Sequence, residues 1–362
     1  MQVSERNYKR IVVKIGSSLL CSDSGEPDTQ VFGNIARQIN LASGQKIEVV
    51  LVSSGAIAMG MHALGIKERP RELGRLQAAA AVGQNELMNA YRSFLGKGWL
   101  CAQILLTWDD FTDRKRYLNA KQTLLALLEA NKHRSRHVLP VINENDTIST
   151  EEIKFGDNDR LSALVATLIN ADLLIILSDV DGLLDGNKNT VPVVAEITSQ
   201  TRELAQPTRK RACVGGMLAK IEAAKIAVDS GIPCIVANGK TKDIISSLIN
   251  NYAQPGEWTL FLPRKGYLAA RKRWIAFSSK PKGMIRVDDG AKAALKNRKS
   301  LLSVGVVAAE MDFAPGDIVS VRDKHGEEFA RGRVRLSREQ LDKVKGRRSD
   351  KEVIHRDNIV IL

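Results

Sequence analysis

Short apolar runs alternate with stretches of helical periodicity through the first 250 residues, and this alternation restricts the chain to few folds. Strands are expected at residues 10–15, 47–52, 101–106, 138–142, 173–177 and 234–237. Helices are expected at residues 28–43, 76–95, 117–130, 160–169, 215–228 and 242–250. Because continuous apolar strands must be covered on both faces, the pattern predicts an α/β fold, a parallel sheet inside an αβα sandwich.

The pattern changes after residue 253, where prolines and glycines interrupt a basic stretch that we expect to connect two domains. From Met284 onward, short runs rich in β-forming residues lie between turns, which predicts a small β-barrel domain. We therefore expect a catalytic domain over residues 1–262, a linker over 263–280 and a second domain over 281–362.

The positive charge is concentrated in the C-terminal part of the chain. Residues 263–362 contain 24 Lys and Arg against 13 Asp and Glu, a net +11, whereas residues 1–262 carry only +2. This asymmetry makes the second domain a candidate for nucleic-acid binding. A soluble domain that happens to be basic is the alternative, and charge alone does not separate the two.

The composition of the chain argues against several other classes of protein. No apolar run approaches the roughly 18 residues of a transmembrane helix, and the first ten residues lack the apolar core of a secretory signal. The four cysteines contain no CxxC pair, which argues against a disulfide framework or a zinc site and for a reducing compartment. We expect a cytoplasmic protein without a membrane contact.

The stretch from Val138 to Leu168 has the layout of a ligand site. An apolar run ends in the polar cluster 143–146, a short charged loop follows, and a second cluster, 156–159, precedes a helical pattern. In open α/β sheets, ligands bind beyond the carboxyl ends of the strands. Asx-rich turns and a helix cap are the alternative. Two clusters around one loop favour a ligand site.

Neither a GxxxxGK[ST] nor a GxGxxG motif is present, so any phosphate site must be assembled from other parts. Lys14 stands near the end of the first strand, before Gly16, and places an ammonium group beside backbone N–H groups. Lys14 could instead only extend from a sheet edge to solvent. Ser53 and Ser54 lie between a strand and a helix. The free backbone N–H groups at the start of that helix would attract an anion. The alternative is that a serine only caps the helix.

Gly215 and Gly216 open a helix that carries Lys220 one turn later. Paired glycines let a phosphate approach the backbone, although they also occur at plain loop–helix junctions. Together with Asp159 and the Ser178-Asp179 pair, these segments suggest phosphoryl transfer, which depends mainly on positioning and on cations near the phosphate oxygens.

The positions of the histidines restrict the chemical class of the phosphoryl acceptor. All five lie outside the motifs above, at positions 62, 133, 137, 325 and 355. A carboxylate acceptor is already ionised and needs no general base, so this distribution favours acyl-phosphate formation. An aspartate acting as the base is the alternative.

Eight segments of this chain closely resemble one branch of the amino acid kinase family, the glutamate 5-kinases. They are VVKIGSS, VLVSSGAIAMG, AAAVGQNELM, QILLTWDDF, RYLNAKQTL, VLPVINENDTIS, EIKFGDNDRLSAL and GGMLAK. The C-terminal segments GMIRVDDGAKAAL, KSLLSVGV, FAPGDIVSV and ARGRV resemble a PUA domain, an RNA-associated module. The resemblance covers nearly the whole chain.

The resemblance implies a reaction and a set of site residues. The reaction is the ATP- and Mg²⁺-dependent phosphorylation of the γ-carboxylate of L-glutamate, which gives L-glutamyl 5-phosphate in the first step of proline synthesis. Lys14 and Lys220 would contact the transferred phosphoryl group, and Asp159 would orient them or help to organise Mg²⁺. The implied glutamate-binding residues are Ser54, Asp146 and Asn158. The implied ATP-binding residues are Lys14, Ser178, Asp179, Val214, Gly215, Gly216, Met217, Leu218, Ala219 and Lys220.

The family also implies feedback inhibition by proline, assembly into dimers or tetramers, and RNA contact through the second domain. In one segment the chain departs from the family, since Val214 and Ala219 occupy positions where hydroxyl side chains are expected. Two alternatives stay open: an amino acid kinase with another carboxylate or phosphate substrate, and an RNA-binding protein on a degenerate kinase scaffold.

Overall fold

The computed structural model describes residues 8–131, 137–149, 158–205, 216–250, 258–264, 270–278, 281–347 and 352–362. The chain forms two compact units. One holds Met1–Asp110 and Lys115–Tyr267, and the other holds Phe111–Arg114 and Leu268–Leu362. No helix in the described part of the chain is long and apolar enough to cross a membrane.

An eight-stranded sheet forms the middle of the first unit, in the order β3-β4-β2-β1-β5-β7-β8-β6. Its strands are β1 (Arg10–Ile15), β2 (Glu48–Ser53), β3 (Trp99–Leu106), β4 (His137–Glu144), β5 (Leu173–Ser178), β6 (Val193–Val194), β7 (Cys234–Asn238) and β8 (Trp258–Phe261). Central β1 pairs in parallel with β2 and with β5. Its residues Ile11, Val12 and Val13 are completely buried, as a strand covered on both faces requires.

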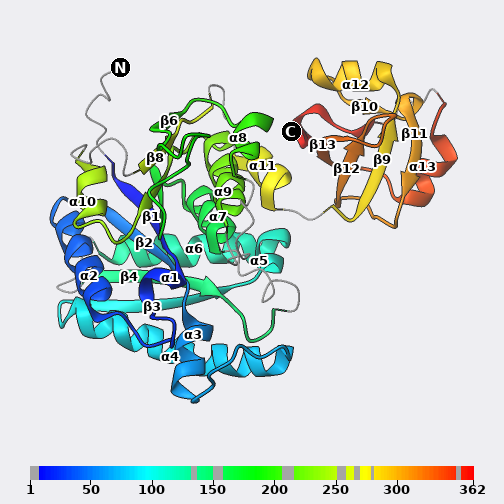
Figure 1. Cartoon of the computed structure of the whole chain (residues 1–362). Helices are drawn as coiled ribbons and strands as arrows, with labels where there is room; N and C mark the ends of the chain where they lie inside the picture. Colours follow the sequence, from blue (N-terminus) through cyan, green and yellow to red (C-terminus); the bar gives the residue numbers. More distant parts are fainter. Residues whose placement is uncertain are drawn as a thin grey trace. The chain divides into compact units, whose positions relative to one another are not determined.

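The sheet is enclosed by helices (Figure 1). Helices within residues 17–249 are α1 (Ser17–Leu20), α2 (Thr29–Gly44), α3 (Ala56–Ala63), α4 (Leu73–Leu95), α5 (Trp108–Thr112), α6 (Arg114–Ala130), α7 (Asn158–Ile169), α8 (Ser199–Glu203), α9 (Met217–Asp229) and α10 (Ile244–Ile249). Figure 1 shows α2 and α10 on one side of the central strands and α7 and α9 on the other. The expected αβα sandwich is confirmed.

One strand runs against the expected direction. The sequence predicted a parallel sheet, but β8 pairs antiparallel with β7, where Ala237 lies opposite Trp258. No strand was expected at residues 258–261, which fall in the expected catalytic domain, whereas Thr259 and Phe261 are completely buried in the sheet. An apolar run of four residues specifies a buried strand but carries no information on its direction, which explains the difference.

Two glycines allow α3 and α4 to pack in close contact. A Cβ atom at Gly60 would overlap the carbonyl oxygen of Ala79, and one at Gly83 would overlap that of Ala56. Only glycine permits such an approach of two helix backbones. The contact matters for function because α4 carries a side chain of the candidate site, Gln84.

The second unit contains a five-stranded sheet in the order β11-β9-β12-β13-β15 and a two-stranded ladder, β10-β14. Its strands are β9 (Gly283–Val287), β10 (Leu301–Leu302), β11 (Val306–Glu310), β12 (Ile318–Arg322), β13 (Glu328–Arg333), β14 (Glu352–Ile354) and β15 (Ile359–Ile361). Its helices are α11 (Ala270–Arg273), η2 (Trp274–Ser278), α12 (Asp289–Lys296), η3 (Ser303–Gly305), α13 (Arg338–Val344) and η4 (Arg356–Asn358). Buried side chains such as Ile285, Val319 and Val353 form a core of its own.

Candidate active site

The carboxyl ends of the central strands lie in register and bring the polar segments to one edge of the sheet. Ile15 of β1 lies opposite Ser53 of β2 and opposite Leu177 of β5. Ser178 in turn lies opposite Asn238 of β7. Residues that follow these strands are therefore neighbours in space, as the general rule for such sheets requires.

The two lysines proposed from the sequence meet at one carboxylate. Lys14 Nζ lies 2.5 Å from Asp159 Oδ1, and Lys220 Nζ lies 3.1 Å from Asp159 Oδ2. Lys14 belongs to β1, Asp159 to the first turn of α7, and Lys220 to the first turns of α9. All three side chains are less than a tenth exposed. Lys14 therefore does not extend from the sheet edge to solvent.

This trio carries an excess positive charge. Burial raises the pKa of Asp159, but the ammonium groups of Lys14 and Lys220 outweigh this effect and hold the pKa below its ordinary value. The carboxylate is therefore ionised at neutral pH, and two cations surround one anion. A buried group of net charge +1 attracts an anion strongly because little solvent screens it.

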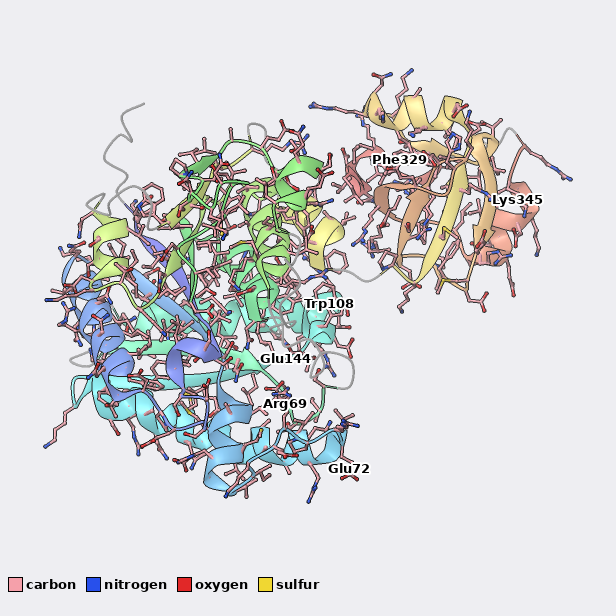
Figure 2. All side chains as sticks on the ribbon, in the orientation of Figure 1. Arg69, Glu72, Trp108, Glu144, Phe329 and Lys345 are labelled. Carbon is pink, nitrogen blue, oxygen red and sulfur yellow. The ribbon has the colours of Figure 1, made fainter. Side chains whose placement is uncertain are left out.

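The first turn of α7 is held in place from a second direction. The guanidinium group of Arg160 lies 4.0 Å from the ring centre of Trp108 in α5, a cation–π contact. Figure 2 labels Trp108, together with Glu144 at the carboxyl end of β4. Arg160 thus anchors the turn that presents Asn158 and Asp159.

Asn158 and Ser54 form a second part of the site. Asn158 Nδ2 donates to Ser54 Oγ at 3.0 Å and to Asn143 Oδ1 at 3.1 Å. Ser54 does not cap α3, because the N-cap is Gly55, which has a φ of 104° and receives no side-chain cap. The simple capping interpretation of Ser54 is therefore wrong, and its hydroxyl group is committed to the site.

The residues expected to bind ATP differ in their burial and in their place in the fold. Ser178 ends β5, is buried, and donates from Oγ to Asp179 Oδ1 at 3.0 Å, while Asp179 itself is exposed. Gly216 caps α9, and Met217, Leu218 and Ala219 form its first turn ahead of Lys220. Val214 and Gly215 lie outside the described residues.

Asp146 lies in the turn that follows β4 and is partly buried. Asn145 N donates to Leu106 O at 2.9 Å, which ties the start of this turn to the neighbouring strand β3. The turn is thus attached to the same sheet edge as Ser54 and Asn158, through β4.

Two residues of the site had no role assigned from the sequence. Asn143 was part of the first polar cluster, and the structure buries it completely and bonds it to Asn158. Gln84 on α4 accepts from Asn143 Nδ2 at 2.8 Å. Gln84 lies in AAAVGQNELM, one of the segments that carry the family resemblance, but nothing in its helical pattern gives it a role, so the contact with Asn143 identifies that role.

The described residues do not provide a separate metal site. They contain no group of three or more His, Cys, Asp or Glu side chains able to hold a metal ion. Asp159, the one carboxylate expected to help organise Mg²⁺, has each oxygen next to a lysine ammonium group. In this arrangement it does not fit as a direct ligand.

Comparison with known proteins identifies the family. Residues 9–238 match the amino acid kinase family, and residues 283–355 match the PUA domain. A glutamate 5-kinase of Caldanaerobacter subterraneus subsp. tengcongensis is 44% identical over 374 residues, which cover 98% of each chain. Glutamate 5-kinases of Syntrophotalea carbinolica and Pelobacter propionicus are 43% and 44% identical, and the matches cover at least 97% of each chain. The chain therefore belongs to the amino acid kinase family, among the glutamate 5-kinases, and carries a PUA domain.

Proposed function

We propose that this chain transfers the γ-phosphoryl group of ATP to the γ-carboxylate of L-glutamate and forms L-glutamyl 5-phosphate. A carboxylate oxygen of glutamate bonds to the γ-phosphorus, the bond to the oxygen that bridges the β- and γ-phosphorus breaks, and ADP leaves. We assign this reaction to residues 1–262, with 263–280 as a linker and 281–362 as a separate domain. The 41–44% identity to glutamate 5-kinases over 98–99% of the chain supports the choice of glutamate.

The observation that carries the proposal is the pair of ion pairs that Asp159 makes with Lys14 and Lys220. Phosphoryl transfer spreads negative charge over the equatorial phosphate oxygens, and fixed cations stabilise that charge. Asp159 fixes both ammonium groups before a substrate arrives, so they need no reorganisation during the reaction. We propose Lys14 and Lys220 as the catalytic cations and Asp159 as the residue that orients them.

Ser54, Asn158 and Asp146 are proposed to bind glutamate. Ser54 and Asn158 share a hydrogen bond, and their polar groups lie beside the trio because Asn158 directly precedes Asp159. The acceptor carboxylate is ionised and needs no general base. Asp146 is suited to the α-ammonium group of the substrate by its opposite charge.

ATP is proposed to bind beside β5 and α9, near Ser178, Asp179 and Gly216–Lys220, with Val214 and Gly215 assigned from sequence alone. Mg²⁺ neutralises charge on the phosphate oxygens when it is bound. In many kinases this ion is held mainly by the substrate phosphates with one or two carboxylates, which is compatible with the absence of a cage among the described side chains.

The test is a hydroxamate assay with purified protein, L-glutamate, ATP and Mg²⁺. We expect hydroxamate that depends on all three, because hydroxylamine traps an acyl phosphate. ADP release with acetylglutamate, aspartate and nucleoside monophosphates, measured in parallel, identifies a different amino acid kinase. No hydroxamate with glutamate, together with ADP release from another acceptor, would contradict the proposal.

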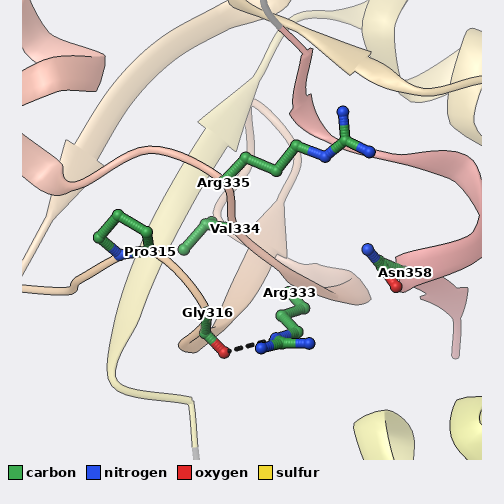
Figure 3. Close-up of a pocket in the computed structure, with 6 residues that line it drawn as sticks. All are labelled: Pro315, Gly316, Arg333, Val334, Arg335 and Asn358. Carbon is green, nitrogen blue, oxygen red and sulfur yellow. Dashed lines mark hydrogen bonds between the residues drawn. The ribbon is translucent and has the colours of Figure 1, made fainter.

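A second candidate function, RNA contact through the PUA domain, is favoured by a pocket of about 390 Å³ in the second unit. Pro315, Gly316, Arg333, Val334, Arg335 and Asn358 line it (Figure 3). Arg333 Nε donates to Gly316 O at 3.0 Å, and Arg335 pairs with Glu352 at 2.8 Å. The guanidinium group of Arg333 has no carboxylate partner among the described residues, so it can bind a phosphate.

Binding of a single-stranded RNA oligonucleotide to the full chain, measured at several salt concentrations, tests this function. Arg333→Gln should weaken binding and lower the salt dependence by about one counterion. Lys296→Gln on α12 removes the same charge outside the pocket and is the control. Equal losses in both variants would mean that the pocket has no specific part. Inhibition by proline, the dimeric or tetrameric state and the cytoplasmic location stay predictions.

A further inference from the structure

Gln84 is a buried polar residue on α4 that contacts the candidate site through Asn143, and it lies in the segment AAAVGQNELM, to which no role was assigned from the sequence. It is 7% exposed, and its Oε1 atom accepts from Asn143 Nδ2 at 2.8 Å. The close packing of α3 against α4 at Gly60 and Gly83 places it there. A long polar side chain is seldom buried without a specific hydrogen-bonding role.

The orientation of the amides follows from one backbone group. The N–H group of Glu144 lies 2.9 Å from one terminal atom of the Asn143 side chain, and an N–H group only donates. That atom must therefore be the oxygen, Oδ1, and the amide nitrogen of Asn143 must face Gln84. Gln84 consequently has to present its oxygen, since two facing nitrogens would repel each other.

The same reasoning extends in the other direction to Ser54. Asn143 Oδ1 is an acceptor, so Asn158 has to face it with Nδ2, which also donates to Ser54 Oγ. Because Ser54 Oγ already accepts this hydrogen bond, its own proton is left to donate elsewhere. Ser54 is thereby set up to bind an acceptor such as a carboxylate oxygen.

Two buried atoms of this chain of amides have no partner among the described residues. They are the acceptor Oδ1 of Asn158 and the donor Nε2 of Gln84. An unsatisfied buried amide atom destabilises the folded chain, so a network that served stability alone would satisfy both atoms. Asn158 Oδ1 is thus a spare acceptor next to the spare donor of Ser54, which suits a zwitterionic ligand with both ammonium and carboxylate groups.

We infer that Gln84 and Asn143 are positioning residues that orient Asn158 and Ser54 toward the amino acid substrate. Gln84 acts through Asn143 and does not need to touch the substrate. The inference rests on the proposed glutamate kinase activity and adds a residue from α4 to its substrate site. In this inference, the hydrogen-bonded side chains Gln84–Asn143–Asn158–Ser54 form a relay that determines the specificity for an amino acid.

The test compares Gln84→Met with Gln38→Met. Both glutamines are buried, and Gln38 Oε1 accepts from Ile245 N at 2.7 Å in α10, so both variants lose a buried hydrogen bond. We expect the KM for glutamate to rise about tenfold in Gln84→Met, with kcat and the KM for ATP changed less than threefold. Gln38→Met should lower the melting temperature but leave the KM for glutamate unchanged.

Two further variants separate positioning from general damage. Gln84→Glu keeps an acceptor oxygen toward Asn143 and should restore the KM to within about threefold of the original chain. Gln84→Met combined with Ser54→Ala should raise the KM no further than Ser54→Ala alone, since both changes affect one interaction. If Gln84→Met does not fold, Gln84→Asn, which keeps the amide but shortens its reach, replaces it.

The outcomes distinguish this inference from the proposed function. A KM for glutamate that rises no more in Gln84→Met than in Gln38→Met would overturn the relay and leave the kinase proposal intact. Fully additive effects of the Gln84 and Ser54 changes would overturn it as well. If the unmodified chain makes no hydroxamate from glutamate, the proposed function fails and the relay fails with it.

Discussion

Lys14 Nζ lies 2.5 Å from Asp159 Oδ1, and the carboxylate that it contacts lies in the first turn of helix α7. The position suits a buried anion because the N-terminus of a helix carries a partial positive charge. Asp159 can therefore stay ionised in the interior and hold Lys14 on one side and Lys220 on the other. The electrostatic centre of the site is thus built before any substrate binds.

Lys220→Ala is expected to lower kcat by about 100-fold or more, because it removes one of the two cations proposed to face the transferred phosphoryl group. Glutamate affinity should change less than threefold, since Ser54 and Asn158 are untouched. Steady-state kinetics and direct binding of glutamate measure the two effects. Lys225→Ala on the same helix, which breaks only the ion pair with Asp229, is the control. Near-normal turnover in Lys220→Ala would refute its role.

Asp159→Asn is expected to destabilise the fold in a pH-dependent way. It leaves two buried ammonium groups without their counter-charge, and breaking a buried ion pair costs about 3–5 kcal/mol. The pKa of Asp159 is lower in the folded chain than its ordinary value. Its contribution is therefore fully present above the unfolded pKa and is lost as the pH falls through the folded pKa.

The free energy of unfolding of the original chain and of Asp159→Asn, measured by denaturant titration between pH 7 and pH 3, checks this. The difference between the two should be largest near neutral pH and shrink in acid. A difference that stays constant over the whole range would mean that Asp159 is not held ionised by the two lysines.

Asp146→Ala is expected mainly to raise the KM for glutamate, with a smaller effect on kcat, because we assign Asp146 to the α-ammonium group of the substrate. The loss of a charge-assisted hydrogen bond corresponds to roughly a tenfold to hundredfold change in KM. Kinetics with varied glutamate at saturating ATP measure it. An unchanged KM would exclude Asp146 as the ammonium partner.

The sequence was sufficient for most of the first unit because its signals are local. The run RIVVKI predicts a buried strand from its β-branched residues alone, and β1 (Arg10–Ile15) matches the expected range. The antiparallel direction of β8 could not be predicted, since pairing is decided by tertiary contacts. Helices α12 and α13 were missed although their caps are visible in the sequence: Asp288 Oδ1 accepts from Ala291 N, and Ser337 and Gln340 form a capping box.

The candidate site, like the fold, has a part that the sequence predicted and a part that it could not predict. The rule that ligands bind beyond the carboxyl ends of strands, together with the family resemblance, placed Lys14, Asp159 and Lys220 in one hypothesis. The structure brings these side chains together. The role of Gln84 could not be predicted, although its segment carries the family resemblance, because its contact with Asn143 depends on how α4 packs across the sheet. Long-range contacts of this kind leave no trace in the periodicity of a helix.

Gly83→Ala is expected to separate α3 from α4 and to damage both stability and substrate binding. The new Cβ atom would overlap the carbonyl oxygen of Ala56, which is backbone and cannot move aside without shifting a helix. Such overpacking costs about 1–3 kcal/mol. Because Gln84 is the next residue, the shift should also raise the KM for glutamate. Denaturant unfolding and steady-state kinetics measure the two effects.

Gly74→Ala provides the matched control on the same helix. Nothing lies within 4 Å of a Cβ atom at that position, so the change should stabilise the chain by about 0.5–1 kcal/mol through helix propensity and leave the KM unchanged. If Gly83→Ala behaved like Gly74→Ala, the close contact between α3 and α4 would not control the position of Gln84. A loss of stability in Gly83→Ala with an unchanged KM would show instead that α4 supports the fold but not the relay.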